Sequence, residues 1–231
     1  MEGRRLVVLS GAGISAESGL ATFRDNGGLW ETYRVEEVAA IEAWRKDPRK
    51  VLHFYNQRRT SLMQANPNKA HHLLADLQAF FKVQIITQNI DDLHERAGSR
   101  QVLHLHGELN KMRSTLNAEK LFPYNRDIHL GDQAPDGGQF RPHVVWFGED
   151  VPYWPMAAGQ VSQADILLII GTSLQVYPAA GLLHFAPESI PKYIIDPRTM
   201  DLPGIPELEH INMTAIRGME QLFPRLLGNQ E

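Results

Sequence analysis

Cysteine is missing from the 231 residues of this chain. Its absence excludes disulfide bonds, metal sites built on thiolates and a cysteine nucleophile. The redox state of the compartment stays undecided on this ground, because a chain without thiols is compatible with both kinds of environment.

A surplus of one charge is missing as well. The chain has 23 Lys and Arg residues against 27 Asp and Glu residues, which gives a formal net charge of −4. Such a balance gives no support to binding of nucleic acid or of a charged membrane surface. We therefore expect neither nucleic acid nor a membrane among the partners.

Long hydrophobic runs are also absent. No stretch of the sequence approaches the ~20 apolar residues of a transmembrane helix. The start, Met1 to Ser10, is too short and too poor in apolar residues for a signal peptide. These features predict a cytoplasmic protein. They do not fix its oligomeric state, for which a monomer is the working expectation.

What the sequence does contain is the ordinary composition of a folded domain, with 43% hydrophobic and 22% charged residues. Strand-like apolar runs alternate with helical patterns. We expect strands at residues 7–10, 83–87, 102–106, 144–147, 166–170 and 192–195. We expect short helical pieces over residues 30–43 and helices at 49–64, 69–80, 91–97 and 214–227, with an irregular excursion over 110–141.

This alternation predicts an α/β fold, a doubly wound parallel Rossmann-like sheet with a smaller inserted subdomain. We assign residues 1–30, 68–109 and 142–231 to the Rossmann-like domain. Residues 31–67 and 110–141 form the subdomain in this scheme, a helical module plus the excursion.

A glycine turn follows the first strand. Gly11, Gly13 and Ala16 have the spacing of a dinucleotide fingerprint, in which small residues permit a tight turn and close approach of a pyrophosphate. The acidic residue that normally follows about 20 residues later is absent, because residues 21–30 resemble a loop. A dinucleotide bound here would not have its ribose held in the standard way.

Polar residues follow each predicted strand, at the edge of the sheet where ligands bind. They are Gly11 to Gly13, Gln88 to Asp91, His106 to Glu108, Phe147 to Glu149, Gly171 to Ser173, and Asp196. Asn89 and Asp91 are also suited to capping the helix after them. His104 and His106 share one face of their strand, where one of them would suit a buried histidine bonded to a carbonyl. His106 is the better catalytic candidate, because a side-chain pKa of ~6.5 suits proton transfer near neutrality.

Several of these segments together resemble the motifs of the sirtuin family, in the same order along the chain. They are Gly-Ala-Gly-Ile-Ser at 11–15 with Phe23-Arg24, Thr-Gln-Asn-Ile-Asp at 87–91, His-Leu-His-Gly-Glu-Leu at 104–109, Val-Trp-Phe-Gly-Glu at 145–149 and Gly-Thr-Ser at 171–173. The resemblance covers nearly the whole chain except residues 110–140. It is greatest to bacterial sirtuins that remove acidic acyl groups.

The resemblance implies NAD-dependent deacylation of lysine on protein substrates, with release of nicotinamide and O-acyl-ADP-ribose. It gives His106 the role of general base on a ribose hydroxyl. Asn89 would orient the ribose and a water, and Asp91 would hold the nicotinamide carboxamide. The other expected NAD contacts are Gly11, Ala12, Gly13, Ile14, Phe23, Arg24, Gln88, Ile90, Gly171, Thr172, Ser173 and Asp196. Val145, Trp146, Phe147 and Gly148 would pair with the substrate peptide as an added strand.

Tyr55 and Arg58 refine the expected substrate. They are three residues apart on a predicted helix and so share a face. In the resembling class, a Tyr-x-x-Arg pair recognises the carboxylate of succinyl, malonyl or glutaryl lysine. A guanidinium and a phenol hydroxyl can bind a carboxylate, whereas a neutral acetyl group leaves them without a partner. The alternative is an ordinary solvated helix face.

The family usually carries zinc cysteines between its His-Gly-Glu motif and its Trp-Phe-Gly strand, and this chain has none. We therefore expect no zinc. Asp127, His129, Asp132 and Asp136 lack the spacing of a tetrahedral site, so a solvated acidic loop is expected there. Apolar packing around Leu116, Leu121, Phe122, Tyr124, Ile128 and Leu130 would have to replace the stabilisation by the metal. A second departure is Asp196, where the family often has Asn.

Three alternatives stay open. The chain could be a general NAD-dependent deacetylase without an acidic preference. It could be a protein ADP-ribosyltransferase using the same NAD site, which His106, Asn89 and Asp91 do not exclude. It could also be a non-catalytic NAD-binding module.

Overall fold

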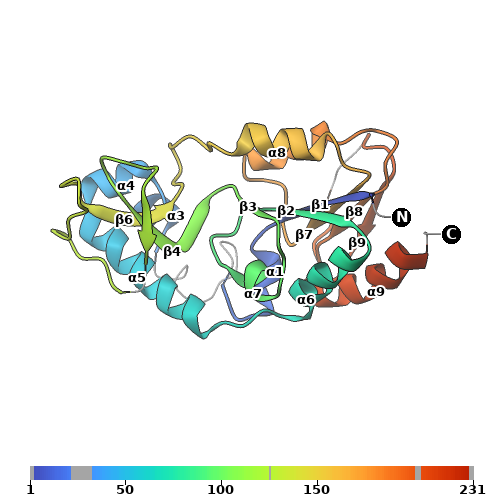
Figure 1. Ribbon diagram of the computed structural model, residues 1–231, viewed down its shortest axis with the longest axis horizontal. Helices are drawn as coiled ribbons and strands as arrows, with labels where there is room; N and C mark the ends of the chain where they lie inside the picture. The colour runs from blue at the N-terminus through green and yellow to red at the C-terminus, as the bar shows by residue number, and fades with distance from the viewer. Residues whose placement is uncertain (1–2, 22–32, 125, 201–203, 229–231) are drawn as a thin grey trace.

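The computed structural model describes residues 3–21, 33–124, 126–200 and 204–228. A larger and a smaller lobe lie side by side along the long axis, as Figure 1 shows. Phe23 and Arg24 lie outside the described residues. Within the described ranges, no helix has the length and apolar character needed to cross a membrane.

The larger lobe is built on a six-stranded parallel sheet with the order β3-β2-β1-β7-β8-β9. Its strands are β1 (Arg5–Ser10), β2 (Lys82–Thr87), β3 (Val102–His104), β7 (Ile166–Ile170), β8 (Lys192–Ile195) and β9 (Leu208–Ile211). All five residues of β7 are buried, as expected of a central strand covered on both faces. The predicted α/β class with a parallel Rossmann-like sheet is confirmed.

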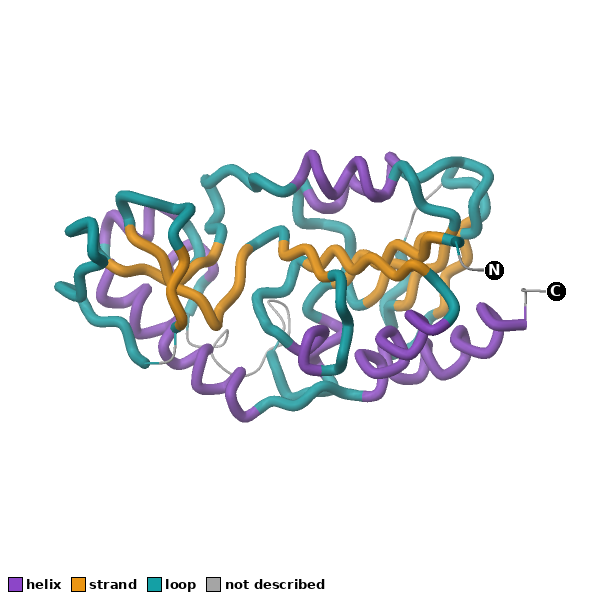
Figure 2. The backbone as a smooth tube through the Cα atoms, in the orientation of Figure 1, coloured by secondary structure: helices purple, strands orange, loops and turns teal. Residues whose placement is uncertain are grey.

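Helices cover both faces of this sheet (Figure 2). On one face, α6 (Lys69–Asp76) and α9 (Ala215–Gly228) pack on Leu6 and Val8 of β1. On the other face, α8 (Trp154–Val161) and the 3-10 helix η2 (Ala179–Phe185) pack on Val7 and Leu9. Because side chains alternate along a strand, β1 contributes to both apolar cores. The larger lobe is therefore a three-layer sandwich in which the central strand β7 is buried along its whole length.

In the described ranges, the smaller lobe holds an antiparallel sheet with the order β5-β4-β6 and the helices α3, α4 and α5. Its strands are β4 (Gly107–Ser114), β5 (Leu121–Pro123) and β6 (Phe140–Val144), and its helices are α3 (Val35–Val38), α4 (Ile41–Lys46) and α5 (Pro48–Gln64). Asp47 caps α5 by accepting a hydrogen bond from the Lys50 amide, and Pro48 occupies its first turn, a position that proline favours. The expected helix at 49–64 is confirmed. The exact boundaries that we assigned to the two domains stay a prediction.

The expectation of an irregular excursion over 110–141 was wrong in part, since β5 and parts of β4 and β6 lie there. The register of β4 against β6 shifts between Glu108 and Met112. Such a bulge breaks the two-residue alternation that makes a strand visible in a sequence.

The expected strand at 144–147 was also wrong beyond its first residue, because β6 ends at Val144. Phe147 makes only an isolated bridge to Ala40, and Gly148 turns the chain with φ +88°. The strand expected at 102–106 ends at His104, and the helix expected at 91–97 is shorter as α7 (Leu93–Arg96). The helix expected at 69–80 divides into α6 and the 3-10 helix η1 (Leu77–Ala79). The helices α8 and η2 and the strand β9 were not predicted from the sequence.

Candidate active site

A cavity of 760 Å³ lies at the carboxyl ends of β1, β2, β7 and β8 and extends to the smaller lobe. Its size is within the range of about 300–1,000 Å³ that is typical of ligand sites. The cavity brings together these predicted site residues: Gly11, Ala12, Gly13, Tyr55, Arg58, Gln88, Asn89, Ile90, Asp91, His106, Val145, Trp146, Phe147, Gly148, Gly171, Thr172, Ser173 and Asp196. Ile14 is not among its lining residues, because that side chain is buried in the core of the larger lobe.

The glycine turn after β1 packs tightly against the turn after β7. The Gly13 amide donates to the Gly171 carbonyl at 2.8 Å, and the Gly11 amide donates to the Ile170 carbonyl at 3.0 Å. A Cβ added to Gly13 would lie 2.7 Å from the Cα of Gly171. The space beside Gly13 is thus filled by protein, so the contact between two turns is what requires glycine. This differs from the sequence interpretation, in which a pyrophosphate filled that space.

Asn89 and Asp91 are both tied to α1 (Gly13–Ala16) through Ser15. The Ser15 hydroxyl donates to Asp91 Oδ2 at 2.9 Å and lies 3.2 Å from Asn89 Nδ2, which also donates to the Gly11 carbonyl. Burial raises the pKa of Asp91. Asp91 also accepts from the Leu93 amide at the start of α7, so the capping alternative applies to Asp91. Ser15 was not singled out from the sequence; its place in the glycine turn was the only signal.

His106 is held in one tautomer by the backbone. Its Nδ1 lies 3.0 Å from the Gln88 carbonyl oxygen. A carbonyl can only accept, so Nδ1 carries the proton and Nε2 keeps its lone pair. Burial lowers the pKa of His106 despite the opposing effect of that hydrogen bond. The imidazole lining the cavity is therefore a neutral base at pH 7.

His104 has a different environment. Its Nδ1 lies 3.0 Å from the Asn89 carbonyl oxygen, and its Nε2 lies 2.8 Å from a Glu95 carboxylate oxygen. Burial lowers the pKa of His104, but the hydrogen bond to Glu95 and the charge of its carboxylate raise it overall. Both nitrogens donate when the ring is protonated. His104 is thus the buried histidine of the pair, and it holds the backbone of Asn89.

Tyr55 and Arg58 do not belong to a solvated face, since both line the cavity and Tyr55 is only 3% exposed. Burial raises the pKa of Tyr55 to about 12, which keeps its phenol protonated. The Trp146 Nε1 donates to the Tyr55 hydroxyl at 3.0 Å. Because the phenol oxygen accepts this bond, its own proton is directed elsewhere. Arg58 keeps its positive charge at neutral pH, although burial lowers its pKa.

Two charged residues, Arg141 and Glu149, hold Trp146 in place in a contact that was not predicted from the sequence. The Arg141 guanidinium lies 3.4 Å from the centroid of the Trp146 ring. It also donates to both carboxylate oxygens of Glu149, at 2.6 and 2.9 Å. Burial raises the pKa of Glu149, but the bond and charge of Arg141 lower it overall. This cation–π contact and ion pair fix the segment that follows β6.

The backbone of this segment already bonds within the protein. The amide of Val145 donates to the His106 carbonyl, and that of Phe147 donates to the Ala39 carbonyl. The Trp146 amide donates to Glu149 at 2.8 Å. Any added peptide strand must therefore use the remaining backbone groups of residues 145–148.

Asp196 follows β8 and is 1% exposed. Both of its carboxylate oxygens accept from the Arg198 guanidinium, each at 2.9 Å. This ion pair forms one part of the cavity wall.

In the part of the chain that the structure describes, no group of three or more His, Asp or Glu residues is placed to hold a metal. The carboxylates over 127–136 have separate partners. Asp127 pairs with Arg59, Asp132 accepts from the His129 amide, and Asp136 accepts from Ser114.

The model of the Sir2 family matches residues 11–178. An "NAD-dependent protein deacylase" of Helicobacter pylori is 51% identical over 224 residues, covering 97% of this chain and 96% of that protein. One of the same name from Bacteroides thetaiotaomicron is 49% identical over 230 residues, covering 97% and 98%.

Solved structures of Sir2 proteins superpose on this chain. A Sir2 homologue in complex with NAD superposes with a TM-score of 0.87 at 38% identity, covering 98% of this chain and 91% of that one. A Sir2 protein with a deacetylated p53 peptide and an acetyl ADP-ribose gives a TM-score of 0.82 at 31% identity, covering 96% and 93%. The match in sequence and in structure extends over both lobes and the cavity between them, and this chain belongs to the Sir2 family.

Proposed function

We propose that this chain, an NAD-dependent protein deacylase of the Sir2 family, prefers succinyl, malonyl or glutaryl lysine to acetyl lysine. The observation that carries the proposal is that one cavity is lined both by a neutral His106 and by the pair Tyr55 and Arg58. The first suits proton transfer and the second suits a carboxylate. Relatives about 50% identical bear the name NAD-dependent protein deacylase.

The residues present fit NAD as the cofactor. The cavity has a volume of 760 Å³ and joins the glycine turns after β1 and β7 to the Asp196 carboxylate. This carboxylate can accept a hydrogen bond from a ribose hydroxyl. A Sir2 homologue of 38% identity has been solved with NAD. When bound, NAD supplies the ribose carbon that receives the acyl oxygen and nicotinamide as the leaving group.

The remaining chemistry belongs to the chain. His106 accepts a proton at Nε2, since Nδ1 is committed to the Gln88 carbonyl. The Asn89 amide is fixed by Gly11 and Ser15 and so orients a ribose and a water. Asp91, held by Ser15, accepts from the carboxamide of nicotinamide. Rigid placement of these three groups supplies proximity and orientation.

The acyl preference follows from the charge of Arg58 and from the hydroxyl proton of Tyr55, which is directed away from Trp146. Both can donate to a carboxylate at the end of the acyl chain, and charge-assisted hydrogen bonds of this kind are the strong ones. An acetyl group has no carboxylate to accept from these two donors, so it gains none of these hydrogen bonds. The polypeptide flanking the lysine adds to residues 145–148, through the backbone groups that the protein leaves available.

Mass spectrometry of matched succinyl-lysine and acetyl-lysine peptides, with and without NAD, tests this proposal. We expect NAD-dependent loss of succinyl well before acetyl, abolished by His106→Ala and weakened by Arg58→Met. Faster loss of acetyl would keep deacylation but refute the acidic preference. Transfer of label from NAD onto protein, with no loss of either acyl group, would favour an ADP-ribosyltransferase.

A further inference from the structure

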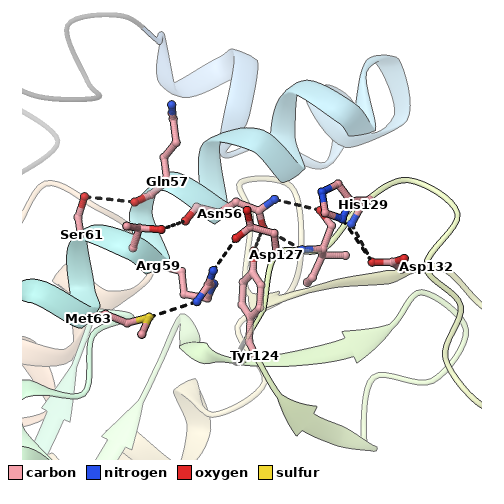
Figure 3. Close-up of polar contacts among 11 residues, drawn as sticks. Asn56, Gln57, Arg59, Ser61, Met63, Tyr124, Asp127, His129 and Asp132 are labelled. Atoms are coloured by element: carbon pink, nitrogen blue, oxygen red, sulfur yellow. Dashed lines mark hydrogen bonds and ion pairs between the residues drawn. The ribbon is translucent and has the colours of Figure 1, made fainter.

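Two neighbouring pairs of side chains on α5 face different parts of the molecule. Tyr55 and Arg58 line the cavity. Asn56 follows Tyr55 and Arg59 follows Arg58 in the sequence. Each therefore lies about 100° further round the helix axis than the residue before it. Figure 3 shows both directed at the segment that connects β5 to β6. Neither Asn56 nor Arg59 lines the cavity.

Asn56 binds this segment as a neighbouring strand would. Its Nδ2 donates to the Ile128 carbonyl at 3.0 Å, and its Oδ1 accepts from the Ile128 amide at 3.0 Å. The same oxygen accepts from the Tyr124 hydroxyl. Ile128 is 2% exposed and Asn56 is 9% exposed. Hydrogen bonds shielded from water in this way are costly to break, because the separated groups stay buried.

Arg59 completes the contact. Its guanidinium forms an ion pair with Asp127 and lies 5.1 Å from the centroid of the Tyr124 ring. The Tyr124 amide donates to the carbonyl of Asn110 in β4 at 2.8 Å, and β4 begins directly after His106. We call Asn56, Arg59, Tyr124, Asp127 and Ile128 the α5 clamp. The α5 clamp joins α5, which carries Tyr55 and Arg58, to β4, the strand that follows the proposed base His106.

In the resembling family this region is held by zinc cysteines, and this chain has no cysteine. The described residues offer no alternative metal cluster. Tyr124, Asp127 and Ile128 of the α5 clamp lie in the same stretch of sequence. They are joined to α5 by hydrogen bonds, one ion pair and a ring contact.

We infer that the α5 clamp is a metal-independent positioning device, which fixes the rotation of α5 and so directs Tyr55 and Arg58 into the cavity. The inference rests on the proposed function for the identity of the acyl group. Asn56, Arg59 and Tyr124 are positioning residues that act through their neighbours on α5. Loosening the clamp selectively weakens recognition of an acidic acyl group.

Kinetics of Tyr124→Phe and Arg59→Met test the inference. For a succinyl peptide we expect KM to rise about tenfold, since small misplacements of binding groups have effects of at least this order. For an acetyl peptide we expect kcat/KM to stay within about twofold, because the proposed chemistry uses residues outside the clamp. Arg59→Lys should restore part of the loss.

Ser61→Ala, on the exposed side of α5, is the matched control and should leave the kinetic constants for both substrates unchanged. Equal losses for the two acyl groups, or an unchanged ratio, would overturn the inference.

Hydrogen exchange separates failure of the clamp from failure of the proposed function. In Asn56→Ala the Ile128 amide loses its acceptor, so it should exchange faster while amides of β1 and β7 do not change. Unchanged exchange at Ile128 would refute the clamp even if the protein removes no acyl group. If Asn56→Ala does not fold, exchange at Ile128 in Asn56→Leu, which also removes the acceptor but keeps the branched shape of the side chain, decides in the same way. Stoichiometric zinc by elemental analysis, or a fall in Tm on addition of EDTA, would overturn the metal-independent part.

Discussion

The Nδ1 of His106 lies 3.0 Å from the carbonyl oxygen of Gln88. This single bond determines the tautomer and therefore the direction in which the ring can accept a proton. The carbonyl belongs to the loop after β2, and the histidine follows β3. Two adjacent parallel strands thus place the proposed base at the edge of the sheet.

The rate of deacylation should have an acid limb below pH 6.5. Burial lowers the pKa of His106 from its ordinary 6.5, so the neutral base persists at pH 6.5 and is lost only as the pH falls further. The measurement is kcat/KM for a succinyl peptide between pH 5 and pH 8. His106→Ala should lower kcat by about 10²–10⁴-fold, the usual contribution of a general base. His72→Ala, on the exposed side of α6, should have wild-type rates. An acid limb above pH 6.5 would contradict the lowered pKa.

Arg58→Met should abolish the preference for an acidic acyl group. The substitution keeps the length and removes the charged donor, and hydrogen bonds to charged groups contribute about 1.5–3 kcal/mol. We expect kcat/KM for the succinyl peptide to fall about 10- to 100-fold, with the acetyl peptide little affected. Arg45→Met, at an exposed arginine of α4, controls for the loss of positive charge. A loss shared equally by both peptides would refute recognition of the carboxylate by Arg58.

The parallel sheet could be predicted from the sequence because its central strands are continuously apolar. The five residues of β7 are all apolar and buried, and in β8 the one polar residue, Lys192, is at the first position. β4 and β9 could not be predicted in this way. The bulge after Glu108 shifts the register of β4, and β9 is a short edge strand with an exposed Glu209.

The cavity residues that follow strands were found for a related reason. The carboxyl ends of parallel strands lie at one edge of the sheet. The residues that follow the strands therefore come together whatever the structure of the connecting segments. Ser15 and Arg141 were missed because their partners are not readable from local spacing. Ser15 bonds to Asp91, 76 positions away. Arg141 is near Glu149 in sequence, but its stacking on Trp146 depends on the turn after β6.

Gly13→Ala should destabilise the fold, whereas Gly159→Ala should stabilise it slightly. An added Cβ at Gly13 would lie 2.7 Å from the Gly171 Cα, a backbone atom that cannot move alone. Overpacking of this kind costs about 1–3 kcal/mol. Gly159 is in α8 with nothing within 4 Å of the added Cβ, so alanine gains up to about 1 kcal/mol of helix propensity. Urea unfolding of both variants gives the comparison. Equal effects would mean that the two turns are not packed as described.

The free energy of unfolding should fall as the pH drops from 6.5 towards 4, in part because of His71. This ring is 0% exposed, and burial, with a smaller contribution from His72, lowers its pKa from 6.5 to about 4. Between these values the unfolded chain binds a proton that the folded chain does not, so acid favours unfolding. The slope from one such histidine is at most roughly 1.4 kcal/mol per pH unit. Urea unfolding at pH 7 and pH 5 measures the difference, which should be smaller in His71→Gln than in the wild type. The exposed histidine variant His53→Gln should keep the wild-type difference. The same difference in His71→Gln and wild type would show that His71 is protonated in the folded protein.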